Sequence, residues 1–311
     1  MNDRRDVIAF LALAAVWGSA FVATEAALAS VPPVLLAALR FDLMALLLFA
    51  AAAVRHREDL CALRPRGWGD WSPVLAGGAL TIGVHHALLF AGQQHVPAAV
   101  ASTLVGLIPV LTPALNRFVR PGQNLSVSTI AGLLCGFVGV VVIANPDPSN
   151  LAATSTGTLL VFASAVVFTL GAVLTDESRA VLPPVPMQAW MALVGAALLH
   201  VAVLVLPSES FAAATWSPAA VGWTVYLAAI PGAVGFFVYF RLLDRLGPVQ
   251  VGLLEYVIPP FAALFAWLLF GDSLTANTVV GFVAVLVGFL LVKSAAVRSA
   301  LRRADGRASA D

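Results

Sequence analysis

Ten apolar runs follow one another along the chain, and short polar stretches separate them. Each run holds about 17 to 25 residues, the length that a helix needs to cross the hydrocarbon core of a bilayer. The pattern therefore predicts an all-α membrane protein with ten transmembrane helices. The spans are expected at residues 7–29, 33–54, 72–92, 98–118, 127–144, 157–175, 187–207, 218–240, 249–270 and 276–293.

Composition agrees with this fold class. Hydrophobic residues make up 60% of the 311 residues and charged residues only 11%, which leaves too little polar surface for a soluble globular protein. A signal peptide is the competing interpretation of residues 7–29, but this run is long, lacks a convincing cleavage site and precedes further spans. The connections are too short for a separate soluble domain, and nothing in them indicates binding of nucleic acid.

The basic residues lie on one side of the expected membrane. If the N-terminus is inside, every one of the 17 Lys and Arg residues except Arg40 lies in an inward connection or at an inward end. Cytoplasmic connections of membrane proteins carry such an excess of basic residues. We therefore expect a multi-pass protein of a bacterial-type inner membrane with both termini in the cytoplasm.

The two halves of the chain repeat one another. The pairs matched by a shift of 151 positions include Thr24 with Thr175, Pro32 with Pro183, Pro97 with Pro248 and Pro109 with Pro260. These matches predict two five-helix repeats, residues 1–150 and 151–311. Because five is an odd number, the second repeat must enter the membrane from the opposite side, and such inverted repeats are typical of transporters that work by alternating access.

Short motifs in the first two spans carry a resemblance to a known family. Residues 17–21 read Trp-Gly-Ser-Ala-Phe, and residues 37–41 read Ala-Ala-Leu-Arg-Phe, with two prolines between them. This stretch resembles the opening of EamA-type members of the drug/metabolite transporter superfamily, and the resemblance covers nearly the whole chain. It implies a ten-helix exporter of small metabolites, with amino-acid exporters as the nearest kind.

Four prolines lie inside expected spans: Pro109, Pro231, Pro259 and Pro260. Each removes a backbone N–H donor and bends its helix, which frees carbonyl groups to face a cavity or a neighbouring helix. Two interpretations stay open at this point. The prolines are either hinges of a moving protein or static kinks that shape the bundle.

Glu25 and Arg40 lie at similar depth in neighbouring spans. With 1.5 Å of rise per residue, they are about 7 and 10 Å from the outer ends of the first and second spans. A charge near the bilayer centre costs ~2.5–3.5 kcal/mol or more unless it finds a partner or water. We expect a structural ion pair between the two residues, with direct substrate binding as the alternative.

Six residues are candidates for substrate binding: Trp17, His85, His86, Phe237, Glu255 and Tyr256. Trp17 lies midway along its span and, with Phe237, suits an apolar cavity wall. His85 and His86 point about 100° apart, so at most one of them is expected to face the cavity directly. Glu255, beside Tyr256, is a candidate for a substrate ammonium group. Packing and helix-to-helix hydrogen bonds are the alternatives for these residues.

Transport by alternating access explains the repeat, the interrupted helices and the short connections together. An intramembrane enzyme would need a catalytic motif that is missing here, and a channel gives no reason for the repeat. No cofactor or metal site is predicted. The expected substrates are amino acids and related small metabolites. Export of drugs or other metabolites is the alternative, proton coupling stays open, and the oligomeric state is undetermined, with a monomer compatible with the pattern.

Overall fold

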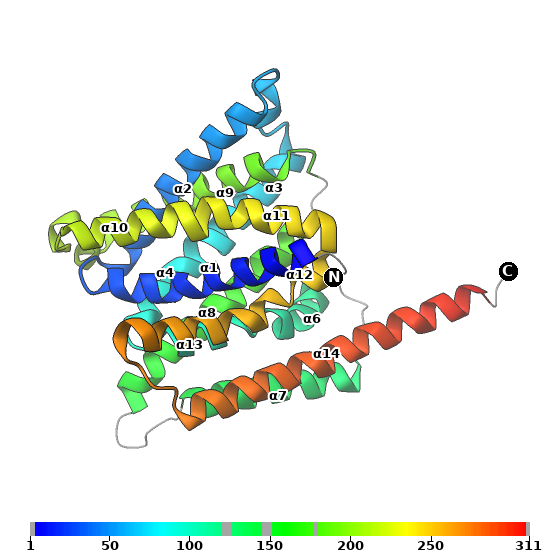
Figure 1. Cartoon of the computed structure of the whole chain (residues 1–311). Coiled ribbons are helices and arrows are strands. Elements are labelled where there is room, and N and C mark those ends of the chain that lie inside the picture. The colour runs from blue at the N-terminus through cyan, green and yellow to red at the C-terminus, as the bar shows by residue number, and fades with distance from the viewer. Residues whose placement is uncertain (1–3, 120–125, 145–150, 177–179, 309–311) are drawn as a thin grey trace.

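The computed structural model describes residues 4–119, 126–144, 151–176 and 180–308, and its ordered elements there are helices (Figure 1). The helices of the first half are α1 (Arg4–Leu28), α2 (Pro33–Arg55), α3 (Trp68–Ala76), η2 (Gly77–Val84), α4 (His85–Gln93), α5 (Ala98–Val105), α6 (Ile108–Val119) and α7 (Val127–Ala144). Those of the second half are α8 (Leu151–Asp176), α9 (Pro184–Val205), α10 (Pro218–Leu227), η5 (Ala228–Val234), α11 (Gly235–Leu246), α12 (Pro248–Val251), α13 (Leu254–Phe270) and α14 (Ala276–Ala308).

The predicted membrane spans are confirmed. In the described part of the chain, 8 helices are long and apolar enough to cross a membrane, and α13 and most of α7 are shorter apolar helices at the two remaining expected positions. One boundary differs from the prediction, because α14 continues to Ala308 instead of ending at residue 293. Alanine and arginine, which favour helices, dominate this extension.

The two halves share an unusual feature in their third span. The π-helical segment η2 begins at Gly77, and η5 begins at Ala228, which is the equivalent position at the 151-residue shift. A π-helix inserts one extra residue per turn and is frequent at functional sites. Pro231 lies inside η5, so its expected disturbance of the helix takes the form of this wider turn.

The fourth and ninth spans are each interrupted. The first breaks between α5 and α6, directly before Pro109, and the second breaks between α12 and α13 at Gly252 and Leu253. Pro259 and Pro260 lie within the continuous helix α13, so the break that we expected beside them occurs earlier in the chain. The interruptions come close to each other, since a Cβ added at Gly106 would lie 3.3 Å from the backbone oxygen of Glu255.

The last helices of the two halves, α7 and α14, lie side by side (Figure 1). A Cβ added at Gly132 would lie 2.5 Å from the backbone oxygen of Gly288, and one added at Gly139 would lie 2.8 Å from that of Gly281. Only glycine allows this approach. Because the numbers rise along one helix as they fall along the other, α7 and α14 are antiparallel, as an inverted repeat requires.

Two buried carboxylates each accept backbone hydrogen bonds from the other half of the chain. Asp70, in α3, accepts hydrogen bonds from the backbone N–H groups of Arg66 (2.7 Å), Val181 (2.8 Å) and Leu182 (3.1 Å). Glu209 accepts them from the first turn of α2, at distances of 2.8 and 3.3 Å. Each carboxylate therefore satisfies donors that lead into, or begin, the second span of the other half.

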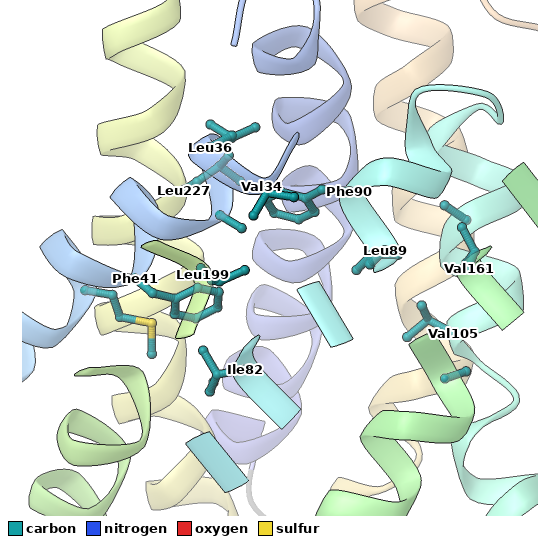
Figure 2. Close-up of a cluster of buried hydrophobic side chains, with 14 of the residues drawn as sticks. Val34, Leu36, Phe41, Ile82, Leu89, Phe90, Val105, Val161, Leu199 and Leu227 are labelled. Atoms are coloured by element: carbon teal, nitrogen blue, oxygen red, sulfur yellow. The ribbon is translucent and has the colours of Figure 1, made fainter. Parts of the chain in front are cut away.

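Between these connections lies a buried apolar core that both halves build (Figure 2). It contains side chains of the first half on α2, α4 and α5 and of the second half on α8, α9 and α10. The residues labelled in Figure 2 are Val34, Leu36, Phe41, Ile82, Leu89, Phe90, Val105, Val161, Leu199 and Leu227. Phe41 and Phe90 also contact His86, which belongs to one of the two clusters described next.

Candidate functional site

Two ring contacts join the halves at equivalent positions. The ring of Trp17 in α1 lies 5.8 Å from that of Phe236 in α11, and the ring of Phe168 in α8 lies 5.0 Å from that of His85 in α4. The shift of 151 residues converts one contact into the other. In both, a ring on the first span of one half meets a residue that lies one or two positions after a π-helical segment of the other half. Four of the six expected substrate-binding residues lie in two clusters: Trp17 and Glu255 in one, His85 and His86 in the other.

The tryptophan cluster consists of Trp17, Phe236, Tyr239 and Glu255. The indole N–H of Trp17 donates a hydrogen bond to the carbonyl of Pro231 in η5 at 3.1 Å, and its ring lies 5.4 Å from that of Tyr239. Tyr239 in turn lies within electrostatic range of the half-buried Glu255. The structure therefore brings Glu255 and Trp17 together through Tyr239, from the helices α13, α1 and α11.

Phe237 and Tyr256 point away from this cluster. The side chain of Phe237 is 37% exposed and its neighbour Phe236 is the one that packs against Trp17, so the place of Phe237 in a cavity wall stays a prediction. The extra residue of the π-helical segment changes which of two neighbouring side chains points inward. Tyr256 packs its ring 4.1 Å from that of Phe289 in α14, and its hydroxyl is buried without a hydrogen-bond partner among the described residues.

The histidine cluster consists of His85, His86, Phe168, Phe41 and Phe90. The Nδ1–H of His85 donates to the carbonyl of Ser164 in α8, and that of His86 donates to the carbonyl of Ile82, both at 3.0 Å. In each ring the nitrogen that donates is thus Nδ1. The imidazoles lie 4.5 Å apart, and the ring of His86 meets Phe41 at 4.5 Å and Phe90 at 5.6 Å.

Arg40 adjoins the histidine cluster, and the predicted ion pair with Glu25 is wrong. Glu25 instead accepts a hydrogen bond from the backbone N–H of Ala98 at 2.8 Å. Ala98 is the first residue of α5, and a helix N-terminus offers both free N–H donors and a positive end. The guanidinium of Arg40 lies over the rings of Phe41 (5.0 Å) and Phe90 (5.7 Å).

A pocket opens beside the same helices. It has a volume of about 380 Å³ and is lined by Glu25, Leu28, Ala29, Gln93, Gln94, His95, Val96 and Pro97. Gln93, whose side chain is 3% exposed, donates from Nε2 to the carbonyl of Phe21 at 3.0 Å. Its Oε1 has no hydrogen-bond partner in the described part of the protein. We call this space the α1–α4 pocket.

One polar contact was missed from the sequence. His200 in α9 has its Nε2 2.6 Å from Oδ2 of Asp42 in α2. Both residues are visible as ionisable positions within spans, but their pairing depends on the antiparallel register of α2 and α9. Among the described residues, no three His, Cys, Asp or Glu side chains gather as metal ligands would.

Two inverted five-span units with interrupted helices and buried polar clusters define a multi-pass membrane transporter rather than an enzyme. The model of the EamA-like transporter family matches residues 5–145 and again residues 155–294. The chain therefore belongs to this family, as its motifs predict. One bacterial relative, from Escherichia coli, is described as an inner membrane transporter, and the chain is 25% identical to it over 90% of this chain and 89% of the relative.

Relatives match over almost the full length. The chain is 28% identical to a probable terminal-alkyne amino-acid exporter of Streptantibioticus cattleyicolor, over 94% of each chain. It is 27% identical to a probable amino-acid metabolite efflux pump of Salmonella typhimurium, over 93% of this chain and 95% of the relative. A solved crystal structure that is 23% identical has the same fold, with a TM-score of 0.64 over 93% of this chain and 96% of its own.

Proposed function

We propose that this protein exports amino acids and related small metabolites across the inner membrane, as a secondary or facilitated transporter that works by alternating access. The observation that carries the proposal is the pair of equivalent ring contacts, Trp17 with Phe236 and Phe168 with His85. Each contact joins one unit to the other beside a π-helical segment. Rocking of the two units breaks one contact while the other holds.

The names of the relatives support the choice of substrate. Two of them are described as exporting or pumping out amino acids or their metabolites. An amino acid needs polar groups for its charged ends and an adaptable apolar wall for its side chain. The two clusters offer both, with Glu255 and the histidines as polar groups and Trp17, Phe236 and Phe168 as wall.

In this proposal Glu255 receives the substrate ammonium group on the cytoplasmic side. It lies near the beginning of α13, close to the interruption of the ninth span, where freed backbone carbonyls add further acceptors. Tyr256 contributes its unpaired hydroxyl when α13 and α14 separate. The units are taken as residues 1–150 and 151–311, with both termini in the cytoplasm.

Flux in proteoliposomes tests the function. Purified protein is reconstituted and given a panel of labelled amino acids, with and without a pH gradient. Flux of several amino acids is expected, and Glu255→Gln should lower it about tenfold, the effect of losing one charge-assisted contact. Phe237→Leu, on the outer face of α11, is the matched control and should retain full flux.

Other results would redirect the proposal. If no amino acid in the panel moves while a cationic dye does, the protein is a drug exporter. Flux that requires the pH gradient shows proton coupling. Reporter fusions after Lys293 and within residues 145–156, part of which lies outside the described residues, test the orientation: only the second should be active in the periplasm.

A further inference from the structure

Arg40 is a buried cation without an anionic partner among the described residues. Arg40 is only 8% exposed, and its Nε has no hydrogen-bond partner among the described residues. Glu25, the acidic residue that the sequence suggests as its partner, bonds Ala98 instead. A charge held at low dielectric without a counter-ion is expensive, so such a residue within a span is by default a functional one.

The groups around Arg40 do not neutralise it. Phe41 and Phe90 present ring faces to the guanidinium, which attract a cation weakly and leave the buried Nε–H without an acceptor among the described residues. His85 and His86 lie within its electrostatic range, but a histidine is either neutral or positive. The donors of Arg40 are therefore available to a ligand that carries negative charge.

The side chain of Gln93 carries a hydrogen-bond acceptor without a partner among the described residues, and it lies on the same face of α4 as Phe90. Gln93 follows Phe90 by three residues in α4, and residues at this spacing are neighbours on a helix surface. Its buried Oε1 has no partner, and its side chain lines the α1–α4 pocket. Gln93 thus lies about one helix turn from Phe90, whose ring the Arg40 guanidinium covers, and beside a space large enough for a small molecule.

We propose that Arg40 binds the carboxylate of the transported substrate, in a site between α2 and α4 that the α1–α4 pocket connects to the outer side. The proposal rests on the proposed function and defines its substrate class as small carboxylic acids, α-amino acids among them. The planar guanidinium fork matches a carboxylate with two parallel hydrogen bonds, which a lysine ammonium does not reproduce. Phe41 and Phe90 hold the fork in place for this contact.

The second unit supplies a control for the fold. The position equivalent to Arg40 is Met191, in α9, which is buried and uncharged. The backbone of this span therefore forms equally well around an apolar side chain. Arg40→Met gives the first unit the residue of the second, and it should leave the fold intact while it removes the carboxylate contact.

The test compares ligands that differ only at their charged ends. Wild type, Arg40→Met, Arg40→Lys and the control Met191→Leu are purified in detergent. Binding of L-leucine, L-leucinamide and 4-methylpentanoate is measured by calorimetry, and proteoliposome flux of labelled leucine is measured in parallel. For wild type and the control, leucine and 4-methylpentanoate should bind more tightly than leucinamide.

The expected result is a selective loss. Arg40→Met should weaken the binding of leucine and of 4-methylpentanoate about tenfold to a hundredfold, and it should change the affinity for leucinamide by no more than about twofold. Arg40→Lys should recover only part of the lost affinity. Equal weakening of all three ligands, or of none, would overturn the role of Arg40. Retained binding of leucinamide shows that the variant is folded.

Failure of the proposed function gives a different pattern. If wild type neither binds nor moves leucine, amino-acid export is rejected, and the carboxylate site is then judged on 4-methylpentanoate alone. Arg40-dependent binding of this acid keeps the site, and its absence removes it. Competition by chloride at a similar affinity would show a general anion site instead of a carboxylate site, and would also overturn the proposal.

Discussion

The two units of this protein have the same backbone plan and different chemistry. In the first unit the π-helical segment is followed by His85 and His86, and in the second unit the equivalent residues are Phe236 and Phe237. Arg40 in the first unit corresponds to Met191 in the second. The repeat therefore preserves the helices and their packing while it assigns most of the buried polar groups to one unit.

The crossing of α2 and α9 shows the same division within one helix pair. Asp42 and His200 form a polar contact of 2.6 Å, and the repeat-equivalent positions are Leu193 and Phe49. One end of the crossing is thus polar and the other apolar. A shared backbone does not require a shared pattern of charge, because helix packing in a membrane depends on shape and on small residues.

The largest expected effect comes from making the units chemically alike. Met191→Arg places a second unpaired cation in a buried position beside Gly77 of η2, and it should lower the free energy of unfolding by ~3–5 kcal/mol. Thermal and detergent unfolding of the purified protein, followed by tryptophan fluorescence, measure this change. Met191→Leu should cost less than about 1.5 kcal/mol. Equal stability of the two variants would show that this position accommodates charge as readily as Arg40 does.

The two buried carboxylates that fasten the connections should also differ. Asp70 accepts three backbone hydrogen bonds and Glu209 accepts two. Asp70→Asn should therefore destabilise the protein by about 2–3 kcal/mol and Glu209→Gln by about 1–2 kcal/mol, since bonds to a charged acceptor exceed neutral ones. Unfolding in mixed micelles ranks the two variants, and the opposite order would contradict this reading of the connections.

A smaller effect is expected at the polar end of the α2 and α9 crossing. Asp42→Leu with His200→Phe gives that end the residues of its apolar counterpart. Each single change leaves one polar side chain without its partner. The double change should therefore lower the free energy of unfolding by about 0.6–1.7 kcal/mol less than the sum of the two single changes. A double-mutant cycle on unfolding measures this coupling. Additive single changes would show that the contact contributes nothing to stability.

The smallest effect distinguishes two neighbouring phenylalanines. Phe236→Leu should cost about 0.5–1.5 kcal/mol, because it removes the ring contact with Trp17, and it should slow substrate flux. Phe237→Leu, on the exposed face, should change stability by less than about 0.5 kcal/mol. Parallel melting curves and flux assays separate the two. A larger effect for Phe237 would return it to the transport path.

The spans and their repetition were predictable because they depend on local properties. A run of apolar residues long enough to cross a bilayer forms a helix wherever it occurs in the chain, since its backbone groups must bond within the segment. Gly132 and Gly139, with Gly281 and Gly288, are the sites where α7 and α14 approach each other closely. Small residues at regular spacing carry that information in the sequence itself.

The predictions that differ from the structure share one cause: the sequence does not show which helices and side chains lie beside one another in the membrane plane. The depth of Glu25 and of Arg40 followed from counting residues, but their pairing also depended on which helix end lies beside Glu25, and that is α5. Phe236 rather than Phe237 packs against Trp17, just after the π-helical segment η5, which the sequence did not reveal. The break of the ninth span was expected at its two prolines and occurs earlier, at Gly252 and Leu253.

The sequence by itself determined that the chain crosses a membrane, how many times it does so, and that two units build it in opposite senses. Only the tertiary structure decided which buried polar groups find partners: Asp42 with His200, Glu25 with Ala98, and Arg40 with none on Nε among the described residues. The physical reason is the separation along the chain of the groups that interact. Backbone hydrogen bonds within a helix are satisfied by residues four positions away, whereas the partners of a buried side chain are set by how distant helices pack.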